Sequence, residues 1–350
     1  SRSRCRARRR GQGVRAALGV IGAGAWGTAL AQAAAGDGSE VLLWAREPDL
    51  AARINAERCN AVYLPGAALA GGVRATSDLA ELAALPALLA VVPAQFLGGV
   101  LARLPELGFA GTPRDLVLCA KGIEAGSGRL MAQVAAEAVP GAEIAVLSGP
   151  TFAHEVAAGL PTAVTLACSG GRAQWARLSP LIARPALRPY YSDDVTGAEV
   201  GGAIKNVLAI ACGVVEGLRL GQNARAALIA RGYAEMLRFG LARGARAETL
   251  SGLCGLGDLV LTCSSTSSRN FSLGLALGEG QSAAEALAGK ATVAEGAATA
   301  PVLRDLARRD GIEMPIVEAV CRLLEGKAPA AEVVSGILAR PLRAEQEPSL

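Results

Sequence analysis

The chain has 350 residues, of which 51% are hydrophobic and 19% are charged, and its formal net charge is +4. This length favours two domains, and this composition is typical of a folded enzyme rather than a disordered tether. Because much of the positive charge lies in the first fifteen residues, the remainder is close to neutral and no nucleic-acid partner is expected.

Residues 1–15 form a leader that is rich in arginine, poor in acids and without an apolar core. This pattern excludes a secretory signal. A transit peptide and a disordered extension are the two remaining interpretations, and we favour the disordered leader. Residues 343–350 are assigned as a tail.

Short apolar runs alternate with alanine-rich helical patterns from residue 16 to residue 195. Such runs are typical of strands covered on both faces, and their alternation with helices predicts an α/β, Rossmann-type domain with a doubly wound parallel sheet. The expected strands are 17–21, 41–44, 88–92, 116–120, 144–147 and 163–167, and the clearest expected helices are 27–35 and 128–138.

From residue 196 to residue 342 the strand signal fades and helical patterns follow one another. Val200, Ile204 and Leu208, for example, recur at helical spacing. We expect an all-helical second domain and a tight junction with a cleft, because no low-complexity linker separates the halves. The expected helices are 197–219, 223–243, 271–279, 282–288, 296–309, 315–324 and 329–338.

The most apolar stretch, residues 200–215, contains Lys205 and Asn206, so a helix buried in protein fits it better than a membrane span. No membrane insertion is expected. The eight cysteines form no CxxC pair and several lie in apolar runs, which indicates reduced thiols and a cytoplasmic protein. Because His154 is the only histidine, no metal site is expected.

A glycine-rich segment, GAGAWG, occupies residues 22–27, directly after the first expected strand and at the start of a helix. In that position its glycines permit a tight turn and let backbone N–H groups approach a pyrophosphate. A glycine-rich turn without a ligand is the alternative interpretation. The expected cofactor contacts here are Gly22, Gly24, Ala25, Trp26 and Gly27.

The residue after the second strand discriminates between nicotinamide cofactors, because an acidic side chain there binds the ribose 2′-hydroxyl of NAD. Arg46 stands in that place and can pair with a 2′-phosphate, which favours NADP(H). Glu47, one residue later, keeps NAD(H) open as the alternative. Arg46 as an ordinary surface arginine is the third interpretation.

Ligands of doubly wound sheets bind beyond the carboxyl ends of the strands. Lys121 closes the apolar run 116–120, so its ammonium group is expected to point into the crevice. Thr151 follows another strand, where it caps a helix that begins near Phe152, hydrogen-bonds a substrate, or does both.

Lys205 is the strongest candidate for acid–base chemistry, because it lies on a helix otherwise lined by small and apolar residues. A partly desolvated lysine has a lowered pKa and can exchange a proton near neutral pH. A lysine that extends from a buried helix to the surface is the equally weighted alternative.

A second cluster combines Asp258 with a hydroxyl-rich loop that ends in Ser268, Arg269 and Asn270. The arginine fork and the N-terminus of the following helix predict an anion pocket, and a flexible loop with an asparagine cap is the alternative. Asp258 is expected to orient Lys205 or to bind a substrate hydroxyl. The segment 292–295, which ends in Glu295, has the pattern of a capping box.

These motifs together resemble one family, the bacterial NAD(P)+-dependent glycerol-3-phosphate dehydrogenases, from about residue 18 to residue 339. The segments that carry the resemblance are, in chain order, VIGAGAWGTALA, VVP, KGIE, SGPTFAHEVAAGLPT, GGAIKN, NARAALIARGYAEM, GLGDLVLTC, SSRN and VAEG. The sequence departs from the family at Ala25, where the family often has serine, and in the basic leader, which has no clear counterpart.

The resemblance implies a reversible hydride transfer between NAD(P)H and dihydroxyacetone phosphate that yields sn-glycerol 3-phosphate for phospholipid synthesis. It also implies an all-α C-terminal domain like that of 6-phosphogluconate dehydrogenase, a cytoplasmic homodimer, and Lys205 as the proton donor and acceptor. Implied substrate contacts are Lys121, Gly149, Thr151, Lys205, Asp258, Ser268, Arg269 and Asn270, and implied cofactor contacts are Trp26, Arg46, Lys121, Ala153, Arg269, Val293 and Glu295.

Two rival interpretations remain. A related β-hydroxyacid-type dehydrogenase would share the two-domain plan and the helical lysine, but it would bind a carboxylate where Ser268, Arg269 and Asn270 predict a phosphate. A nucleotide-sensing protein without chemistry would keep the glycine-rich turn and lose the second cluster, which is intact here.

Overall fold

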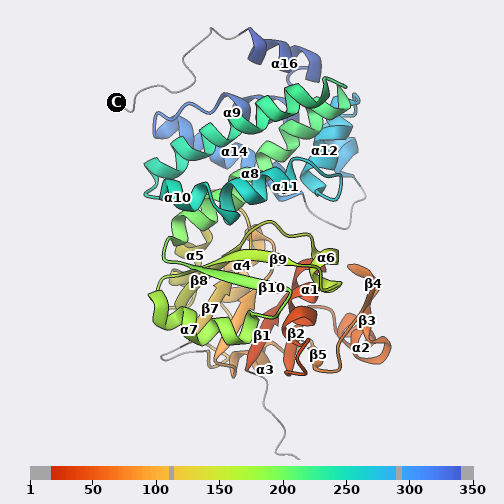
Figure 1. Ribbon diagram of the computed structural model, residues 1–350, viewed down its shortest axis with the longest axis vertical. Coiled ribbons are helices and arrows are strands. Elements are labelled where there is room, and N and C mark those ends of the chain that lie inside the picture. Colours follow the sequence, from red (N-terminus) through yellow and green to blue (C-terminus); the bar gives the residue numbers. More distant parts are fainter. Residues whose placement is uncertain (1–16, 110–113, 289–293, 340–350) are drawn as a thin grey trace, which may run out of the picture.

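The computed structural model describes residues 17–109, 114–288 and 294–339, and these form two domains (Figure 1). The sheet domain ends with strand β10 at Ser192, and the helical domain begins with helix α8 at Val195. The expected leader at 1–15 and the expected tail at 343–350 lie outside the described residues.

The sheet domain is built on eight strands in the order β10-β9-β8-β7-β6-β1-β2-β5. The strands from β5 to β8 in this order are parallel, which confirms the Rossmann-type arrangement for that part. In chain order, the eight strands of the sheet are β1 (Leu18–Ile21), β2 (Val41–Trp44), β5 (Val73–Thr76), β6 (Ala87–Ala90), β7 (Asp115–Leu118), β8 (Glu143–Ser148), β9 (Thr162–Cys168) and β10 (Leu187–Ser192).

The expectation of a wholly parallel sheet is wrong at β9, which pairs antiparallel with β8. For β9 to run parallel to β8, a crossover would have to carry the chain from the carboxyl ends of the strands back to their amino ends. Helix α6 (Ala153–Ala157) instead packs its Val156 against Ala29 of α1 (Ala25–Ala34), beside the carboxyl end of β1. The chain therefore starts β9 at the end of the sheet where β8 finishes, and β9 runs in the opposite direction.

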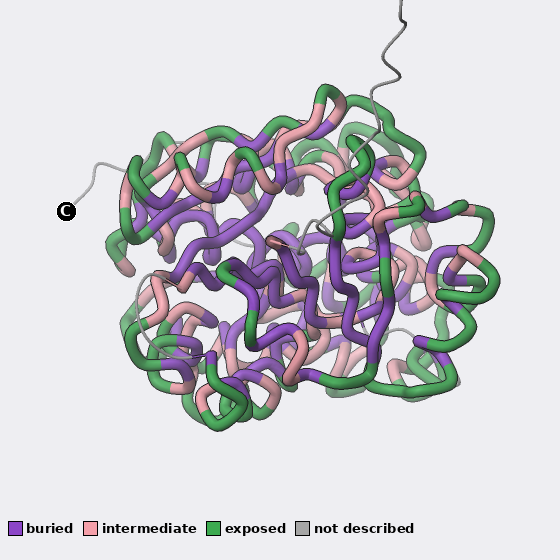
Figure 2. The backbone as a smooth tube through the Cα atoms, turned by 90° about the horizontal axis from the view of Figure 1, so that it is seen from below, coloured by how far each residue is buried: buried purple, intermediate pink, exposed green. Residues whose placement is uncertain are grey.

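Helices cover both faces of the sheet, and apolar side chains from strands and helices meet in two layers. One face carries α1, α2 (Pro48–Glu57) and α7 (Gly171–Ile182), and the other carries α3 (Leu79–Ala83), α4 (Ala94–Leu101) and α5 (Met131–Ala138). Figure 2 shows buried residues in the interior of the molecule and exposed residues at its periphery. The expected helix at 128–138 begins only at Met131, because Gly128 has φ +70° and Leu130 is extended.

Several short elements were not expected from the sequence. They are β5, β10 and a separate two-stranded ribbon of β3 (Cys59–Asn60) and β4 (Leu64–Ala68). In β10 exposed residues alternate with buried ones, as in Arg188 and Tyr190. These strands therefore lack the continuous apolar run by which the central strands are recognised.

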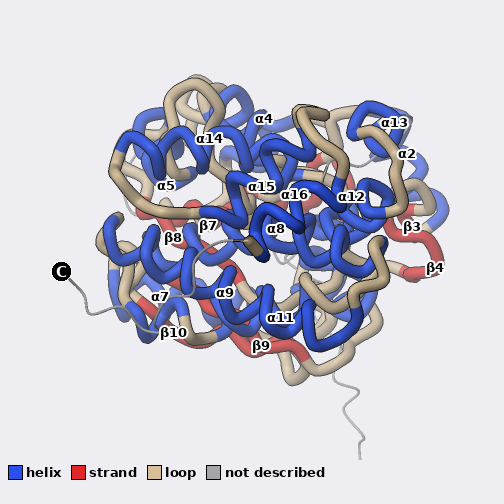
Figure 3. Tube along the Cα trace, turned by 90° about the horizontal axis from the view of Figure 1, so that it is seen from above, coloured by secondary structure: helices blue, strands red, loops and turns tan. Residues whose placement is uncertain are grey.

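The helical domain surrounds α8 (Val195–Gly217), which lies over the sheet in Figure 3. Its other helices are α9 (Gly221–Ala242), α10 (Ala247–Leu250), α11 (Asp258–Thr262), α12 (Arg269–Gly278), α13 (Ala283–Leu287), α14 (Glu295–Arg309), α15 (Pro315–Leu324) and α16 (Ala330–Leu338). Helices α10 and α11, with the π-helical segment Leu253–Gly257 between them, were not expected.

Helix α8 passes the length and hydropathy tests for a membrane span, but its apolar window is wholly buried inside the protein. This agrees with the expectation of a buried helix for this segment. Helices α8 and α12 cross with their backbones in contact, because a Cβ on Gly213 would overlap the Phe271 carbonyl oxygen and one on Gly274 would overlap the Ile210 carbonyl oxygen.

Candidate active site

The glycine-rich turn lies at the carboxyl end of β1, where the strand order reverses between β1 and β6. Gly22 has φ +114°, which residues with a Cβ rarely adopt. A Cβ on Gly27 would overlap the Gly22 carbonyl oxygen, so α1 starts in close contact with the turn. Nothing lies within 4 Å of the Cβ position of Gly24, so a ligand has room beside the N–H groups that open α1. The turn therefore fits the pyrophosphate of a dinucleotide.

Arg46 and Glu47 follow β2 on the surface and pair with each other. The Arg46 Nη2 atom lies 2.8 Å from Glu47 Oε1, and the Arg46 side chain is 81% exposed. A 2′-phosphate would compete with Glu47 for this guanidinium group. The geometry is therefore compatible with both interpretations of Arg46, as a phosphate ligand and as a surface residue.

Lys205, Asp258 and Lys121 form one hydrogen-bonded cluster at the junction of the two domains. Lys205 Nζ donates to Asp258 Oδ1 at 2.5 Å, and Lys121 Nζ donates to Asp258 Oδ2 at 2.7 Å. Lys205 Nζ also donates to Thr262 Oγ1 at 2.9 Å, and Lys121 Nζ donates to the Gly149 carbonyl oxygen at 3.2 Å. Lys205 is 5% exposed, so the alternative of a lysine that reaches the surface is wrong.

Burial lowers the pKa of Lys205 below its ordinary value, because the ammonium form loses its water. The Asp258 carboxylate opposes this shift, while the ammonium group of Lys121 adds to it. The amine can therefore release and regain a proton closer to neutral pH than an exposed lysine can. Asp258 holds it in place, which matches one of the two roles expected for that aspartate.

Glycines allow the segment before Asp258 to pack closely against α8. A Cβ on Gly201 would overlap the Cys254 carbonyl oxygen, and a Cβ on Gly255 would overlap the Leu250 carbonyl oxygen. The π-helical segment Leu253–Gly257 therefore packs backbone against backbone on α8 and ends where α11 begins with Asp258. The glycines in this segment position the carboxylate.

The end of the hydroxyl-rich loop forms the N-terminus of α12. Ser268 is the N-cap, and its Oγ accepts from the Phe271 N–H at 3.2 Å. The alternative of an asparagine cap is therefore wrong. Asn270 Oδ1 accepts from the Gly296 N–H at 2.9 Å, which ties α12 to α14. Arg269 is exposed beside this helix end, where it can meet an anion.

Glu295 is the first residue of α14, and its Oε1 accepts from the Ala94 N–H of the sheet domain at 3.2 Å. It spans the domain junction. Burial raises the pKa of Glu295, and the positive charges of Arg269 and Lys121 oppose the shift. The capping-box interpretation of segment 292–295 is wrong, because Ala294 is the N-cap of α14 and Glu295 is its first residue. Thr292 and the cofactor candidate Val293 lie outside the described residues.

Thr151 does not cap a helix, because Phe152 is the N-cap of α6 and no side chain bonds that end. The Thr151 hydroxyl donates instead to the Gly149 carbonyl oxygen at 3.3 Å, the same oxygen that Lys121 contacts. Ala153, the first residue of α6, shares a small apolar cluster with Trp26 and Ala25. The structure thus brings the segment after β8 to both the lysine cluster and the glycine-rich turn.

Sequence reasoning missed two polar residues of this site. Thr262 contacts Lys205, and its Oγ1 donates to Asp258 Oδ1 at 3.2 Å across one turn of α11. The four-residue spacing from Asp258 was the available signal. Asn206 is buried next to Lys205, and its Nδ2 donates to the Lys121 carbonyl oxygen at 3.4 Å.

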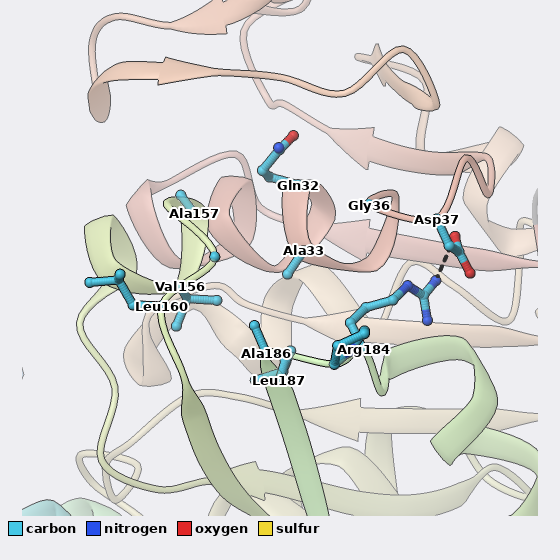
Figure 4. Close-up of a pocket in the computed structure, with 12 residues that line it drawn as sticks. Gln32, Ala33, Gly36, Asp37, Val156, Ala157, Leu160, Arg184, Ala186 and Leu187 are labelled. Carbon is cyan, nitrogen blue, oxygen red and sulfur yellow. Dashed lines mark hydrogen bonds and ion pairs between the residues drawn. The ribbon is translucent and has the colours of Figure 1, made fainter.

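A cavity of about 360 Å³ lies away from these residues, between α1, α6 and the start of β10 (Figure 4). Its walls include Ala33, Val156 and Leu187, and its rim carries the ion pair between Arg184 Nη2 and Asp37 Oδ1 at 3.1 Å. None of the site residues predicted from the sequence lines it. Among the described residues no group of histidine, cysteine, aspartate and glutamate could hold a metal ion.

Two family models match the chain. Residues 17–174 match the N-terminal model and residues 194–335 match the C-terminal model of NAD-dependent glycerol-3-phosphate dehydrogenase. Among curated proteins, the NAD(P)+ glycerol-3-phosphate dehydrogenase of Erythrobacter litoralis is 69% identical over 332 residues, which are 95% of this chain and 98% of that protein.

The chain belongs to the NAD-dependent glycerol-3-phosphate dehydrogenase family. The enzyme of the same name from Novosphingobium aromaticivorans is 70% identical over 328 residues, 94% of this chain and 98% of that protein. The resemblance inferred from the sequence motifs is thereby confirmed.

Solved structures agree with this assignment. Glycerol-3-phosphate dehydrogenase from Coxiella burnetii has a TM-score of 0.87 at 41% identity and covers 92% of this chain and 98% of its own. The enzyme from Saccharomyces cerevisiae has a TM-score of 0.79 at 29% identity and covers 92% of this chain and 99% of its own. The two-domain architecture is therefore that of the family.

Proposed function

We propose that this chain reduces dihydroxyacetone phosphate reversibly to sn-glycerol 3-phosphate with NAD(P)H. The observation that carries the proposal is the buried Lys205 amine, which Asp258 and Thr262 hold at the junction between the two domains. A buried amine fixed in this way suits proton transfer to an oxygen beside the nucleotide domain.

When bound, the reduced nicotinamide supplies the hydride. Lys205 in its ammonium form donates a proton to the carbonyl oxygen of C2, so that one hydride and one proton convert the ketone into the alcohol. Asp258 keeps the amine in position and balances its charge. In the reverse direction the neutral amine removes the hydroxyl proton.

The phosphate of the substrate is assigned to Arg269 and the N-terminal N–H groups of α12. A guanidinium fork and a helix N-terminus both favour a phosphate over a neutral group. Lys121, Gly149, Thr151, Ser268 and Asn270 complete the proposed substrate contacts, and Lys121 also faces the cofactor. Anchoring the phosphate fixes C2 relative to the amine, which supplies the proximity part of catalysis.

The cofactor is assigned to the turn of Gly22, Gly24, Ala25, Trp26 and Gly27, together with Arg46, Ala153, Arg269, Val293 and Glu295. NADP(H) is the favoured cofactor because Arg46 can pair with a 2′-phosphate, and NAD(H) is the alternative that Glu47 would serve. We also propose a cytoplasmic homodimer that supplies glycerophospholipid synthesis.

The test is an assay of the purified chain with dihydroxyacetone phosphate, in which the absorbance of NADPH or NADH reports turnover. Lys205→Ala should abolish turnover and leave NADPH affinity nearly intact, while Lys327→Ala, at an exposed lysine, should leave both unchanged. No turnover of the wild-type chain with either cofactor would contradict the proposal. Turnover of a β-hydroxyacid in its place would favour the related dehydrogenase class.

Arg46→Ala tests the cofactor preference. If Arg46 binds the 2′-phosphate, its loss removes a charge-assisted contact and should raise the KM for NADPH about tenfold or more, with little change for NADH. Initial rates at varied cofactor concentration measure both. An equal loss for the two cofactors would show that Arg46 does not recognise the 2′-phosphate.

A further inference from the structure

Asn60 lies directly behind the glycine-rich turn, although it is far from it in sequence. It ends the short strand β3, and only 1% of its surface is exposed. Its Nδ2 donates to the Ala23 carbonyl oxygen at 2.8 Å and to Thr28 Oγ1 at 2.8 Å. The Thr28 hydroxyl in turn donates to the same Ala23 oxygen at 3.4 Å, and Thr28 is fully buried. Two side chains from different elements thus hold one carbonyl group of the turn.

Holding the Ala23 carbonyl fixes the direction of the next N–H group. A trans peptide is planar, so its C=O and N–H point to opposite sides. Because the Ala23 oxygen is turned inward to Asn60 and Thr28, the Gly24 N–H is turned outward. The Gly24 residue also has room for a ligand beside it, because nothing lies within 4 Å of its Cβ position.

We propose that Asn60 is a positioning residue for the cofactor, because it sets the peptide plane that aims the Gly24 N–H at the pyrophosphate. The inference rests on the proposed function, since it requires a dinucleotide in this turn. In this proposal Asn60 acts on the cofactor through its hydrogen bonds to Ala23 and Thr28.

The bonding pattern explains why an amide stands in this buried place. An apolar side chain would fill the same space without desolvating a polar group. Only a side chain with two N–H donors can serve the Ala23 oxygen and the Thr28 hydroxyl together. The Oδ1 of Asn60 also accepts from the Tyr63 N–H at 3.3 Å, which orients the amide.

Asn55 provides a matched control on α2. Its Nδ2 donates to the Ala75 carbonyl oxygen at 2.8 Å, and its Oδ1 accepts from the Ala75 N–H at 2.8 Å. It therefore also braces backbone with one amide, but it braces the edge strand β5 and not the glycine-rich turn.

The experiment compares Asn60→Leu, Thr28→Val and Asn55→Leu with the wild-type chain. All three changes are neutral in charge, so none alters the electrostatic attraction for the pyrophosphate. NADPH fluorescence titration without substrate measures cofactor affinity, thermal unfolding measures stability, and initial rates give kcat and the KM for dihydroxyacetone phosphate.

Asn60→Leu should raise the Kd for NADPH about tenfold, since one lost hydrogen-bond network of about 1.4 kcal/mol corresponds to that factor. The KM for dihydroxyacetone phosphate should change by less than about twofold, and kcat at saturating cofactor should fall far less than the affinity. Thr28→Val, which keeps the side-chain volume, should raise the Kd by a smaller factor. Asn55→Leu should lower the unfolding temperature and leave the Kd unchanged.

If Asn60→Leu and Thr28→Val both bind NADPH as tightly as the wild-type chain, the inference is overturned and Asn60 is structural only. If Asn60→Leu fails to fold, the Kd of the nearly isosteric Thr28→Val for NADPH is the test: a raised Kd supports the inference, and a wild-type Kd overturns it. A wild-type chain that binds neither NADPH nor NADH would overturn the proposed function together with this inference, whereas normal wild-type activity with unchanged variants overturns this inference alone.

Discussion

Lys205 shows how one side chain acquires its chemistry from its surroundings. It is buried on an apolar helix, yet its amine has two hydrogen-bond acceptors, Asp258 and Thr262. Burial disfavours the charged form and the carboxylate favours it, so the two protonation states lie closer in free energy than in water. A residue that must give a proton in one direction and take it in the other needs this balance.

The pH dependence of the two directions should therefore be opposite. Reduction of the ketone needs the ammonium form, so its kcat should fall as pH rises through the pKa of Lys205. Oxidation of the alcohol needs the neutral amine and should rise over the same range. Because burial lowers the pKa of Lys205, both changes should lie between neutral pH and the ordinary lysine value of 10.5.

Steady-state rates in both directions across that range check this prediction, with cofactor and substrate saturating. Parallel profiles in the two directions would contradict the role of Lys205. A change centred at or above 10.5 would instead contradict the effect of burial.

At this scale the sequence predicted the ionisable residues better than their partners. Lys205, Asp258 and Lys121 stand out because charged side chains in apolar or glycine-rich segments are uncommon. Asn60 and Thr262 could not be assigned in advance, because their importance depends on which backbone carbonyl or amine the fold brings to them.

At the scale of elements, helices α8 and α12 cross with their backbones in contact. Gly213 and Gly274 lie at the contact, where either Cβ would overlap a carbonyl oxygen of the other helix. Glycines therefore allow the two backbones to touch. The helix that carries Lys205 and the helix that begins with Arg269 are held at a fixed separation.

Gly213→Ala should force α8 and α12 apart. We expect a loss of stability of about 1–3 kcal/mol, the usual range for overpacking, together with a higher KM for dihydroxyacetone phosphate. Urea unfolding and initial rates measure the two effects. Gly336→Ala is the control, because nothing lies within 4 Å of its Cβ position on α16, and it should stabilise by about 0.5–1 kcal/mol. Equal effects of the two substitutions would argue against the backbone contact.

A second element-scale feature joins the domains through Glu199 of α8. Its Oε1 accepts from the Ala132 N–H at 2.7 Å, so it serves the first turn of α5. Burial raises the pKa of Glu199 to about 8, and the backbone hydrogen bonds to Ala132 and Met131 oppose the shift. The folded protein therefore holds a proton here at pH values where the unfolded chain has lost it.

This linkage has a definite sign. Between the ordinary glutamate pKa of 4.5 and about 8, folding takes up a proton at Glu199, so its contribution to stability is full at the acidic end and falls as pH rises. Glu199→Gln removes the titration, and the free energy of unfolding of this variant should fall less with pH than that of the wild-type chain. Urea unfolding at both ends of the window measures the difference. Identical slopes for the two proteins would refute the prediction.

The sequence predicted some of the helices and strands and missed others. The spacing of apolar residues predicted the central strands and the long helices. A strand buried on both faces is a continuous apolar run, and a helix buried along one face has apolar residues at helical spacing. The direction of β9 was not predictable, because it depends on α6 packing beside α1. Helices α10 and α11 were missed because each is too short to show a helical period.

At the scale of the whole molecule, Asp258 links the two domains through ion pairs. Its two oxygens bind an amine from each domain, Lys205 from the helical domain and Lys121 from the sheet domain. One buried carboxylate thus keeps two ammonium groups together at the junction.

Asp258→Asn should remove this balance. With no anion between them, the two amines repel and Lys205 loses the partner that favours its charged form. We expect kcat to fall by about 10²-fold or more, as for loss of a general acid, while the Kd for NADPH stays nearly constant. Rates and fluorescence titration check this.

Asp115→Asn is the control for loss of a buried ion pair. Asp115 is 5% exposed and pairs with Arg177 at 2.9 Å, away from the site. It should lower stability without lowering kcat. A similar fall in kcat for both variants would mean that Asp258 acts through stability alone.

The glycine contact between α8 and α12 has a consequence for substrate choice. Two touching backbones cannot slide or separate without a clash or a void, so the distance from the Lys205 amine to the N-terminus of α12 is fixed. If these two groups act as proposed, that distance cannot adjust to substrates of different length. A phosphorylated ketone with one more carbon between its carbonyl and its ester would overshoot that span, and one with a carbon fewer would fall short. Selectivity for chain length is then a property of the framework, set before any ligand arrives.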